Sequence, residues 1–376
     1  MHSWFFDWDG ITLFAFFLSI VILSAAALWT GLVALRATIV YQRAAKEKSG
    51  LQAALIVVVS CVILFLLLLP FARAWLQPAP KVDIWAAGTG VVVHSVDGGR
   101  TWEPRPINGA TFEEIKYATP NAVIAVGKDG GIWRTMDGGK TWNPVRWGAG
   151  DHKGANLEGV SFPTPQIGWA VGQKGLLLKS EDGGNTWGAM DTSKSANFRT
   201  AGDLLDLTFS TPQNGWIIGD GGSILSTEDG GHSWGLVKTP VSETLYFIAF
   251  GTPLCGWVTG SNNSIFHTQD GGATWVAQKS GITDGLDGVA AVNCSSAWVV
   301  SDKGRILHTD DGGANWKLQN SGTTGRLYEI AFTDTRIGWA VGNDGVILHT
   351  EDGGVTWKFQ LSGTDDGLST LTIVKP

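Results

Sequence analysis

One eight-residue pattern occurs seven times in the chain and constrains its fold more than any other feature. It reads Ser/Thr-x-Asp-Gly-Gly-x-Thr-Trp, and only the sixth copy departs noticeably, with Asn315 where the other copies carry Thr or Ser. The two glycines permit positive φ angles that a residue with a Cβ resists. The Asp carboxylate accepts hydrogen bonds from amides of its own turn, and the Trp returns the chain to the interior. Each copy therefore predicts one tight β-hairpin.

The Asp and Trp residues of these hairpins recur in register and are predicted to be structural. The Asp residues are Asp97, Asp137, Asp182, Asp229, Asp270, Asp311 and Asp352. The Trp residues are Trp102, Trp142, Trp187, Trp234, Trp275, Trp316 and Trp357. The copies recur every 40 to 47 residues. Short strands punctuated by Gly and Trp at that period predict a β-propeller.

The last repeat shows four strands, at 327–332, 338–342, 346–350 and 357–361. The first repeat begins at Ile84 without an opening strand, whereas an additional strand, 368–374, follows the last repeat. We therefore predict an all-β seven-bladed β-propeller in which the C-terminal strand closes the first blade. Closure of this kind leaves no long unpaired sheet edge.

The whole repeat carries a family resemblance, most clearly between Leu327 and Trp357. It reads Leu-x-x-Ile-x-Phe, then Gly-Trp-Ala-Val-Gly, then Gly-x-Ile-Leu-His-Thr-x-Asp-Gly-Gly-x-Thr-Trp. This unit resembles the Asp-box (bacterial neuraminidase repeat) superfamily and, within it, the photosystem II stability/assembly factor-like propellers, over roughly 84–374. The resemblance implies a propeller that assists assembly or stability of photosynthetic membrane complexes. The sequence departs from that family in its N-terminal segment and in having few arginines where a basic binding patch is expected.

The N-terminal segment contains two runs without a charged residue, 11–35 and 51–72. Each is long enough to cross a bilayer as a helix. We therefore predict two transmembrane α-helices in an anchor of residues 1–75, a linker at 76–83 and the propeller at 84–376. A signal peptide is the alternative, but Asp7 and Asp9 stand where a basic leader is required.

The loop between the two runs, 36–50, carries four basic residues, whereas the N-terminal tail carries no Lys or Arg. The positive-inside rule then places this loop in the cytoplasm. The sequence thus predicts a two-pass protein of a bacterial inner or photosynthetic membrane, with its N-terminus and propeller on the periplasmic or lumenal side. Cys61 lies in the second predicted span, while Cys255 and Cys294 fall in corresponding turns of adjacent repeats. Whether the latter two pair is left open by the sequence.

Composition argues against nucleic acid as a partner. The net charge is −7, and residues 1–75 carry five Lys or Arg against three Asp or Glu. The rest of the chain therefore holds 22 basic against 31 acidic residues, a balance of −9. An acidic propeller of this kind is not expected to bind a phosphate backbone.

The search for catalytic chemistry yields weak candidates. Sialidases share the Asp turn and use a Tyr nucleophile beside a carboxylate. Tyr117, Tyr246 and Tyr328 have neighbouring Glu residues, but other repeats place Phe or Leu at the same strand position, which favours packing. The sequence has no phosphate loop, dinucleotide fingerprint or paired metal-ligand motif. We therefore predict no catalytic residue, no cofactor and no metal.

Four histidines occupy one position, three residues before the Asp of their hairpins: His94, His267, His308 and His349. The spacing argues against a shared metal ion, because neighbouring sheets lie about 10 Å apart while metal ligands lie about 2 Å from the ion. We expect an exposed ring of polar strand ends, with a pH-sensitive contact ring as the alternative.

The innermost strands carry acidic residues near their starts. These are Glu113, Glu114, Glu158, Asp206, Asp287 and Glu329. They could make one end of the central channel negative and attract a cation or a basic peptide, or they could form a solvated rim. Arg199 and Arg326 enter the same face, together with an insertion at 191–203. The predicted partner-binding residues are Arg199, Arg326, Glu158, Asp206 and Glu329.

These observations favour a non-catalytic, membrane-anchored, extracytoplasmic propeller. It would act as an accessory, assembly or stability subunit of a membrane protein complex, photosynthetic if the resemblance extends to function. Its expected partners are the lipid bilayer and subunits of that complex, bound through the predicted helices and one propeller face. Two alternatives stay open: a periplasmic accessory protein of a membrane transporter, and a carbohydrate-binding or glycoside-hydrolysing propeller.

Overall fold

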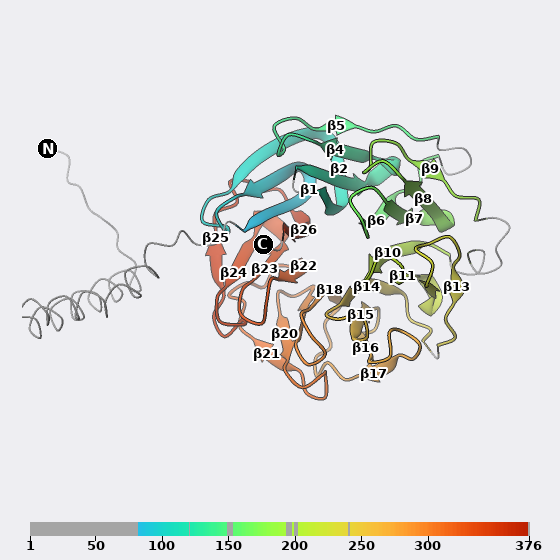
Figure 1. Ribbon diagram of the computed structural model, residues 1–376. Coiled ribbons are helices and arrows are strands. Elements are labelled where there is room, and N and C mark those ends of the chain that lie inside the picture. The colour runs from blue at the N-terminus through green and yellow to red at the C-terminus, as the bar shows by residue number, and fades with distance from the viewer. Residues whose placement is uncertain are drawn as a thin grey trace, which may run out of the picture. The chain divides into compact units, whose positions relative to one another are not determined.

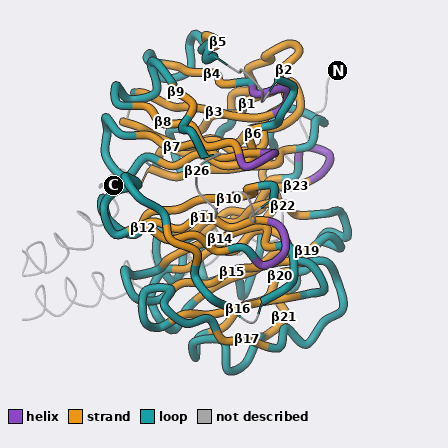
Figure 2. The backbone as a smooth tube through the Cα atoms, turned by 90° about the vertical axis from the view of Figure 1, so that its right-hand side faces the viewer, coloured by secondary structure: helices purple, strands orange, loops and turns teal. Residues whose placement is uncertain are grey.

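The computed structural model describes residues 82–119, 121–148, 153–192, 198, 202–239 and 241–374. All of them belong to one compact unit, Ala79–Pro376. Figure 1 shows that this unit is a ring of β-sheets around a central axis. Figure 2 shows the ring from the side, with the strands running between its two faces. The predicted all-β propeller is therefore confirmed.

The ring consists of short antiparallel strands. Their bounds are β1 (Asp83–Ser95), β2 (Glu103–Thr119), β3 (Ala122–Gly127), β4 (Ile132–Thr135), β5 (Asn143–Pro144), β6 (Leu157–Ser161), β7 (Gly168–Gly172), β8 (Leu176–Ser180), β9 (Gly188–Ala189), β10 (Leu204–Phe209), β11 (Gly215–Gly219), β12 (Ile224–Thr227) and β13 (Gly235–Leu236). They continue with β14 (Leu245–Phe250), β15 (Gly256–Gly260), β16 (Ser264–Thr268), β17 (Val276–Gln278), β18 (Leu286–Ala291), β19 (Ala297–Ser301), β20 (Ile306–Thr309), β21 (Lys317–Gln319), β22 (Leu327–Phe332), β23 (Gly338–Gly342), β24 (Ile347–Thr350), β25 (Lys358–Gln360) and β26 (Leu368–Val374). Short 3₁₀ turns join second and third strands: η1 (Lys128–Gly130), η3 (Gln173–Gly175), η4 (Asp220–Gly222) and η5 (Asn343–Gly345).

The described strands form six hydrogen-bonded sheets, so the prediction of seven blades was wrong. Five sheets have four strands each, and the sixth has six strands in the order β26-β1-β2-β3-β4-β5. The cause is the length of β2, which has 17 residues. It pairs with β1 through Glu103–Pro106 and with β3 through Phe112–Thr119. Thr111 also pairs with Thr89 of β1, directly before Phe112 pairs with Gly127 of β3, so the chain continues as one strand.

The C-terminal strand completes the six-stranded sheet, as the sequence predicts. β26 pairs antiparallel with β1, with Ile373 opposite Ile84 and Leu371 opposite Ala86. The two ends of the propeller sequence are therefore held together by backbone hydrogen bonds, and the ring has no open edge at its innermost strand.

No helix in the described part of the chain has the length and apolar character needed to cross a membrane. The predicted spans 11–35 and 51–72, with the loop 36–50, lie outside the described residues. The two transmembrane helices and the two-pass membrane location with a periplasmic or lumenal propeller are thus not supported, and we do not retain them. The domain boundaries at 75 and 83 stay predictions.

Each repeated hairpin is held by the same hydrogen bonds, as the last copy illustrates. The Thr350 hydroxyl donates to Asp352 at 2.8 Å and accepts from the Gly354 N–H at 2.8 Å. The Asp352 carboxylate also accepts the backbone N–H and the hydroxyl of Thr356 at 2.9 and 2.7 Å. In the sixth copy the Asn315 amide replaces that hydroxyl and donates to its Asp at 2.8 Å. Asn315 therefore makes the same hydrogen bond within its hairpin that Thr or Ser makes in the other copies. We call these structures the Asp-box hairpins.

The second glycine of an Asp-box hairpin lies over a Trp of the preceding repeat. A Cβ at Gly139 would stand 2.2 Å from Trp85, and one at Gly231 would stand 2.4 Å from Trp169. Both glycines also have positive φ, of 76° and 88°. Steric space and backbone conformation thus both exclude a side chain there.

The hairpin Trp residues also reach back to the preceding repeat through Gln residues of its outer strand. The indole N–H groups of Trp316 and Trp357 donate to Gln278 and Gln319, both at 3.2 Å.

The prediction that the four histidines form an exposed ring is wrong. His94 and His267 are buried, and His308 and His349 are half-buried. The rings stack on second-strand Trp residues at centroid distances of 3.6 to 4.6 Å.

The structure settles the question of the two cysteines. Cys255 and Cys294 form a disulfide, with Cα atoms 5.0 Å apart. It joins the turn after β14 to the turn after β18, which belong to neighbouring sheets.

We expect the two hydroxyls of an Asp-box hairpin to differ in their contribution to stability. Thr350→Val should lower the free energy of unfolding by about 1–3 kcal/mol, because it leaves the buried Gly354 N–H without its acceptor. Thr356→Val, which removes an exposed hydroxyl from the same carboxylate, should cost about 1 kcal/mol or less. Urea unfolding curves of the two variants provide the comparison. Equal losses would contradict this account.

Candidate functional site

The innermost strands share an irregularity that directs side chains into the channel. The pairing register shifts between Phe112 and Glu114, between Leu204 and Asp206, and again at the start of β22. A bulge of this kind re-aims the side chains beside it. The residue before each shift, which is Phe112, Leu204 or Leu327, packs in the core. The two side chains that follow it lie at the channel.

The third residue of several inner strands accepts a backbone N–H from the next inner strand around the ring. The pairs are Glu114 with Val160 at 2.5 Å, Asp206 with Ile248 at 2.9 Å, Glu329 with Leu371 at 2.6 Å and Thr370 with Ile115 at 3.2 Å. A buried N–H without an acceptor would cost roughly 1–3 kcal/mol. The three carboxylates therefore hold adjacent sheets together, and Thr370 joins β26 to β2 within the six-stranded sheet. Glu114 and Asp206 are thus structural as well as charged.

Lys116 bridges two of these acids across the channel. Its Nζ lies 2.5 Å from Oε1 of Glu114 and 3.4 Å from Oε1 of Glu329. Burial raises the pKa of Glu114 to about 7, although Lys116 opposes that shift. Burial alone would lower the pKa of Lys116, but the two carboxylates raise it above its ordinary value. The lysine therefore keeps its charge and compensates the buried acids.

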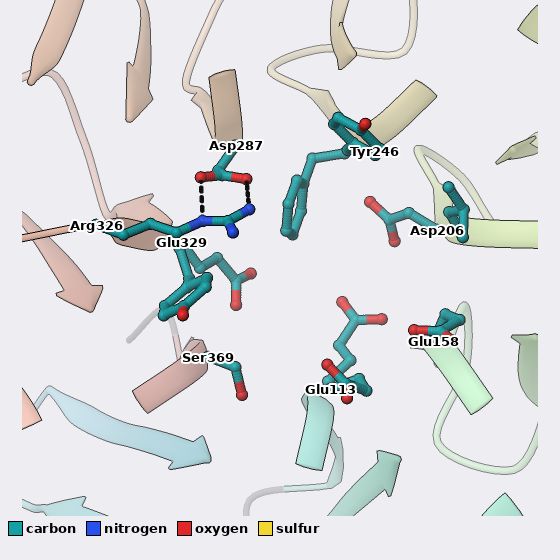
Figure 3. Close-up of a pocket in the computed structure, with 12 residues that line it drawn as sticks. Glu113, Glu158, Asp206, Tyr246, Asp287, Arg326, Glu329 and Ser369 are labelled. Atoms are coloured by element: carbon teal, nitrogen blue, oxygen red, sulfur yellow. Dashed lines mark hydrogen bonds and ion pairs between the residues drawn. The ribbon is translucent and has the colours of Figure 1, made fainter. Parts of the chain in front are cut away.

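One face of the ring has a cavity of about 290 Å³ at the starts of the inner strands. We call it the channel-mouth cavity. Its lining is Glu113, Glu114, Glu158, Leu205, Asp206, Tyr246, Phe247, Asp287, Arg326, Tyr328, Glu329 and Ser369. Figure 3 shows side chains from several strands converging on it. A second cavity of about 330 Å³ continues into the channel and shares Glu114, Asp206 and Glu329 with the first.

Two glutamates at the mouth have raised pKa values. Burial raises the pKa of Glu158 to about 7, and the charge of Glu113 adds to the shift. Burial also raises the pKa of Glu113. Asp206, deeper in the cavity, has its pKa raised by burial and by Glu114. Proton uptake and a bound cation therefore compete for the same carboxylates.

Across the cavity, Arg326 and Asp287 form a two-bond pair, drawn with dashed lines in Figure 3. The guanidinium Nε and Nη2 donate to the Asp287 carboxylate at 2.8 and 2.6 Å. The guanidinium also lies 4.8 Å from the ring centroid of Tyr328. Burial raises the pKa of Asp287, whereas Arg326 opposes the shift. This arginine is thus fixed in place by an acid and an aromatic ring.

The described residues contain no group of three side chains suited to hold a metal ion.

The sequence also matches a known protein family. The sequence profile described as photosynthesis system II assembly factor YCF48 matches residues 106–196, 232–323 and 314–373. These segments cover more than half of the chain. The chain belongs to the YCF48 assembly factor family.

Solved structures of YCF48 proteins share the fold. One, described as YCF48 bound to D1 peptide, superposes with a TM-score of 0.57 at 19% identity, covering 76% of this chain and 87% of that chain. YCF48 from Cyanidioschyzon merolae gives a TM-score of 0.55 at 21% identity, covering 68% and 86%. An ancestral GH74 enzyme superposes with a TM-score of 0.52 at 12% identity, covering 80% of this chain and 39% of the enzyme's chain. These identities show a shared fold alone. No curated protein matches the sequence.

Four of the five predicted partner-binding residues line the channel-mouth cavity of this YCF48-family propeller. They are Glu158, Asp206, Arg326 and Glu329. The fifth, Arg199, lies outside the described residues. The alternative of a solvated acidic rim is wrong for Glu114, Asp206 and Asp287, which are 8%, 7% and 4% exposed.

Sequence reasoning missed the links between these residues. It did not foresee that Lys116 joins Glu114 to Glu329, or that Arg326 clasps Asp287. The signal was available in part, because Lys116 lies on an inner strand and Arg326 directly before one, each within three residues of an acid. The bulges that turn these residues toward one another have no pattern in the sequence.

We expect Lys116→Met to destabilise the ring by about 2–4 kcal/mol at pH 8, since it leaves two largely buried carboxylates without their cation. The loss should be smaller at pH 6, where Glu114 can take up a proton. Lys128→Met, on η1, is the matched control and should have little effect. Urea unfolding at both pH values tests the difference. A loss that does not depend on pH would contradict the proposed compensation.

Glu158→Gln should stabilise the protein at high pH. The pKa of Glu158 is raised to about 7 in the folded state, so folding takes up a proton between pH 4.5 and 7. Stability from this group is present at low pH and is lost as pH rises through 7. The substitution should add about 1–2 kcal/mol at pH 8, after discounting for partial exposure, and almost nothing below pH 4.5. A stability gain that is equal at pH 4 and pH 8 would exclude this linkage.

Proposed function

We propose that this protein is a non-catalytic assembly or stability factor of a membrane protein complex. In this proposal it binds a peptide segment of a complex subunit at the channel-mouth cavity. Membership of the YCF48 family supports the assembly role. The relative described as bound to a D1 peptide supports a peptide as the ligand. The observation that carries the proposal is a cavity of about 290 Å³ whose walls come from all the sheets and are mostly acidic and aromatic.

The bonding of the acids supports binding over catalysis. Glu114, Asp206 and Glu329 each accept a backbone N–H of the neighbouring sheet. Asp287 is held by Arg326. A general base or nucleophile must be free to reach its substrate. Acids that maintain the fold are better suited to set the electrostatic potential of a binding site.

Glu113 and Glu158 are the carboxylates proposed to contact the ligand directly. Within the described ranges, neither forms an ion pair with Lys or Arg, and each has its pKa raised by burial. Tyr246 and Tyr328 provide aromatic faces in the same cavity. Carboxylates and aromatic rings together suit an ammonium or guanidinium group. The proposed ligand is therefore a peptide segment that presents Lys or Arg.

Arg326 is proposed to contact the peptide backbone. Its Nε and Nη2 are engaged by Asp287, and Nη1 is left to donate to a carbonyl oxygen. Asp206 and Glu329 lie deeper and contribute negative potential. Arg199 stays a predicted contact on the same face.

A fluorescent peptide containing three lysines tests the proposal, with the same peptide acetylated on those lysines as the reference. Glu113→Gln combined with Glu158→Gln should weaken binding of the lysine peptide by roughly tenfold. Binding by the wild-type protein should be tighter at pH 8 than at pH 6, because Glu158 loses its proton in that interval. Fluorescence anisotropy titrations measure both effects.

The control variant is Glu351→Gln, which removes an exposed carboxylate from an Asp-box hairpin at the other face. It should bind like the wild-type protein. The double variant keeps a folded ring by the stability argument above, so weak binding cannot be attributed to unfolding. Equal affinity for the lysine peptide and its acetylated form would exclude the channel mouth as a site for basic segments.

A glycoside-hydrolysing propeller is the second candidate, and one observation favours it. Glycosidases use two carboxyl groups, one of them protonated near neutral pH, and Glu158 beside Glu113 has a pKa of about 7. Hydrolysis of fluorogenic glycosides by the wild-type protein, abolished by Glu158→Gln, would replace the binding role with this one.

A further inference from the structure

The Asp-box hairpins lie at the face opposite the channel-mouth cavity. In the last repeat, Thr350 begins the hairpin and pairs with Gly338, which pairs with Phe332 at the end of β22. Tyr328 and Glu329, at the start of the same strand, line the cavity. The strands run between the two faces of the ring in Figure 2. The hairpins therefore present a second surface that the proposed function does not use.

Two of the seven hairpins differ from the rest at their two exposed variable positions. The first hairpin has Val96 and Arg100, and the second has Met136 and Lys140. We call these four residues the basic hairpin pair. The equivalent positions elsewhere hold Glu181 and Asn185, Glu228 and His232, Gln269 and Ala273, Asp310 and Ala314, and Glu351 and Val355. The apolar and basic residues thus coincide on two adjacent repeats, while four of the other five carry an acid.

The side chains of the basic hairpin pair are directed to solvent. Val96 and Met136 are 54% and 53% exposed, and Arg100 and Lys140 are exposed. The fold does not require them, because the hairpin is held by its Ser or Thr, Asp and Gly residues. The two hairpins are also neighbours, since Gly139 of the second lies over Trp85 of the first repeat. Two adjacent repeats therefore present an exposed apolar side chain together with an exposed basic one.

The chain preceding the propeller arrives at this surface. Val82 accepts a hydrogen bond from the Gly98 N–H of the first hairpin at 3.1 Å. The 81 residues before it contain the two uncharged runs, 11–35 and 51–72, identified in the sequence.

We propose that the basic hairpin pair docks on an anionic lipid surface. Lys and Arg near a bilayer are attracted by acidic headgroups, and apolar side chains beside them insert at the headgroup boundary. The five other hairpins carry acids or neutral residues and would be repelled or indifferent, so the ring would contact lipid on one side. An acidic protein segment would use Arg100 and Lys140 but would leave the exposure of Val96 and Met136 without a role. Docking in this way leaves the channel mouth facing away from the lipid.

A spin label on the full chain tests this proposal. The label is attached at Val96→Cys in a Cys61→Ser background, and at Gln269→Cys, the same position of the fifth hairpin, as the control. Collision rates with oxygen and with a water-soluble nickel chelate are measured on vesicles of phosphatidylcholine and of phosphatidylcholine with about a third phosphatidylglycerol. With the anionic vesicles, the label at Val96 should gain oxygen collisions and lose nickel collisions, and the label at Gln269 should not change.

Charge reversal tests the cause. Arg100→Glu with Lys140→Glu should return the Val96 label to the accessibility measured on neutral vesicles, whereas Ala273→Glu with Ala314→Glu should leave it protected. The proposal is overturned if the Val96 label is equally accessible on both kinds of vesicle, or if the Gln269 label is protected to the same extent. It is also overturned if an acidic peptide such as polyglutamate protects the Val96 label and anionic vesicles do not.

Discussion

The ring depends on the contact between each Asp-box hairpin and the repeat before it. A hairpin holds itself together through one carboxylate and two further polar side chains, but its second glycine also lies against a side chain of the preceding repeat, as Gly139 does with Trp85 and Gly184 with Ile124. Outer-strand Gln residues add hydrogen bonds in the same direction, as from Trp357 to Gln319. Each repeat thus completes the core of its neighbour. Local hairpin geometry and long-range packing are therefore specified by the same eight residues.

The channel has a second set of links between sheets, and these also carry the candidate function. Bulges at the starts of the inner strands direct acids toward the axis, where they accept backbone N–H groups of the next strand. Lys116 compensates two of them. A negative channel mouth is thus a consequence of how the sheets are joined. Glu113 and Glu158 add to that potential without serving the backbone, which leaves them free for a ligand.

The repeat period and the turn chemistry were sufficient to predict a propeller, all seven Asp-box hairpins and the closing strand 368–374. The number of sheets was wrong because Thr111 still pairs with β1 directly before Phe112 pairs with β3, so β2 belongs to both ladders, a local effect that repeat counting ignores. The histidine ring failed for another reason. A residue three before the Asp lies opposite a second-strand Trp, as His267 lies opposite Trp257, and stacking buries it. The sequence predicted that Glu158, Asp206, Arg326 and Glu329 share one face, and they line one cavity, but their burial and pairing depend on bulges that leave no sequence pattern.

Two groups of carboxylates in this protein respond to their surroundings in opposite ways. In the hairpins, hydrogen bonds from Thr141 and Thr135 lower the pKa of Asp137 to about 2, so the stability this group provides is lost only as pH falls below the ordinary Asp range. At the channel, burial raises the pKa of Glu114 and Glu158 to about 7, so their charge changes near neutral pH. The hairpins that hold the ring are thus fully ionised throughout the interval in which the channel mouth titrates. The affinity that we propose for a basic segment at the mouth would therefore vary with pH while the hairpin scaffold stays intact.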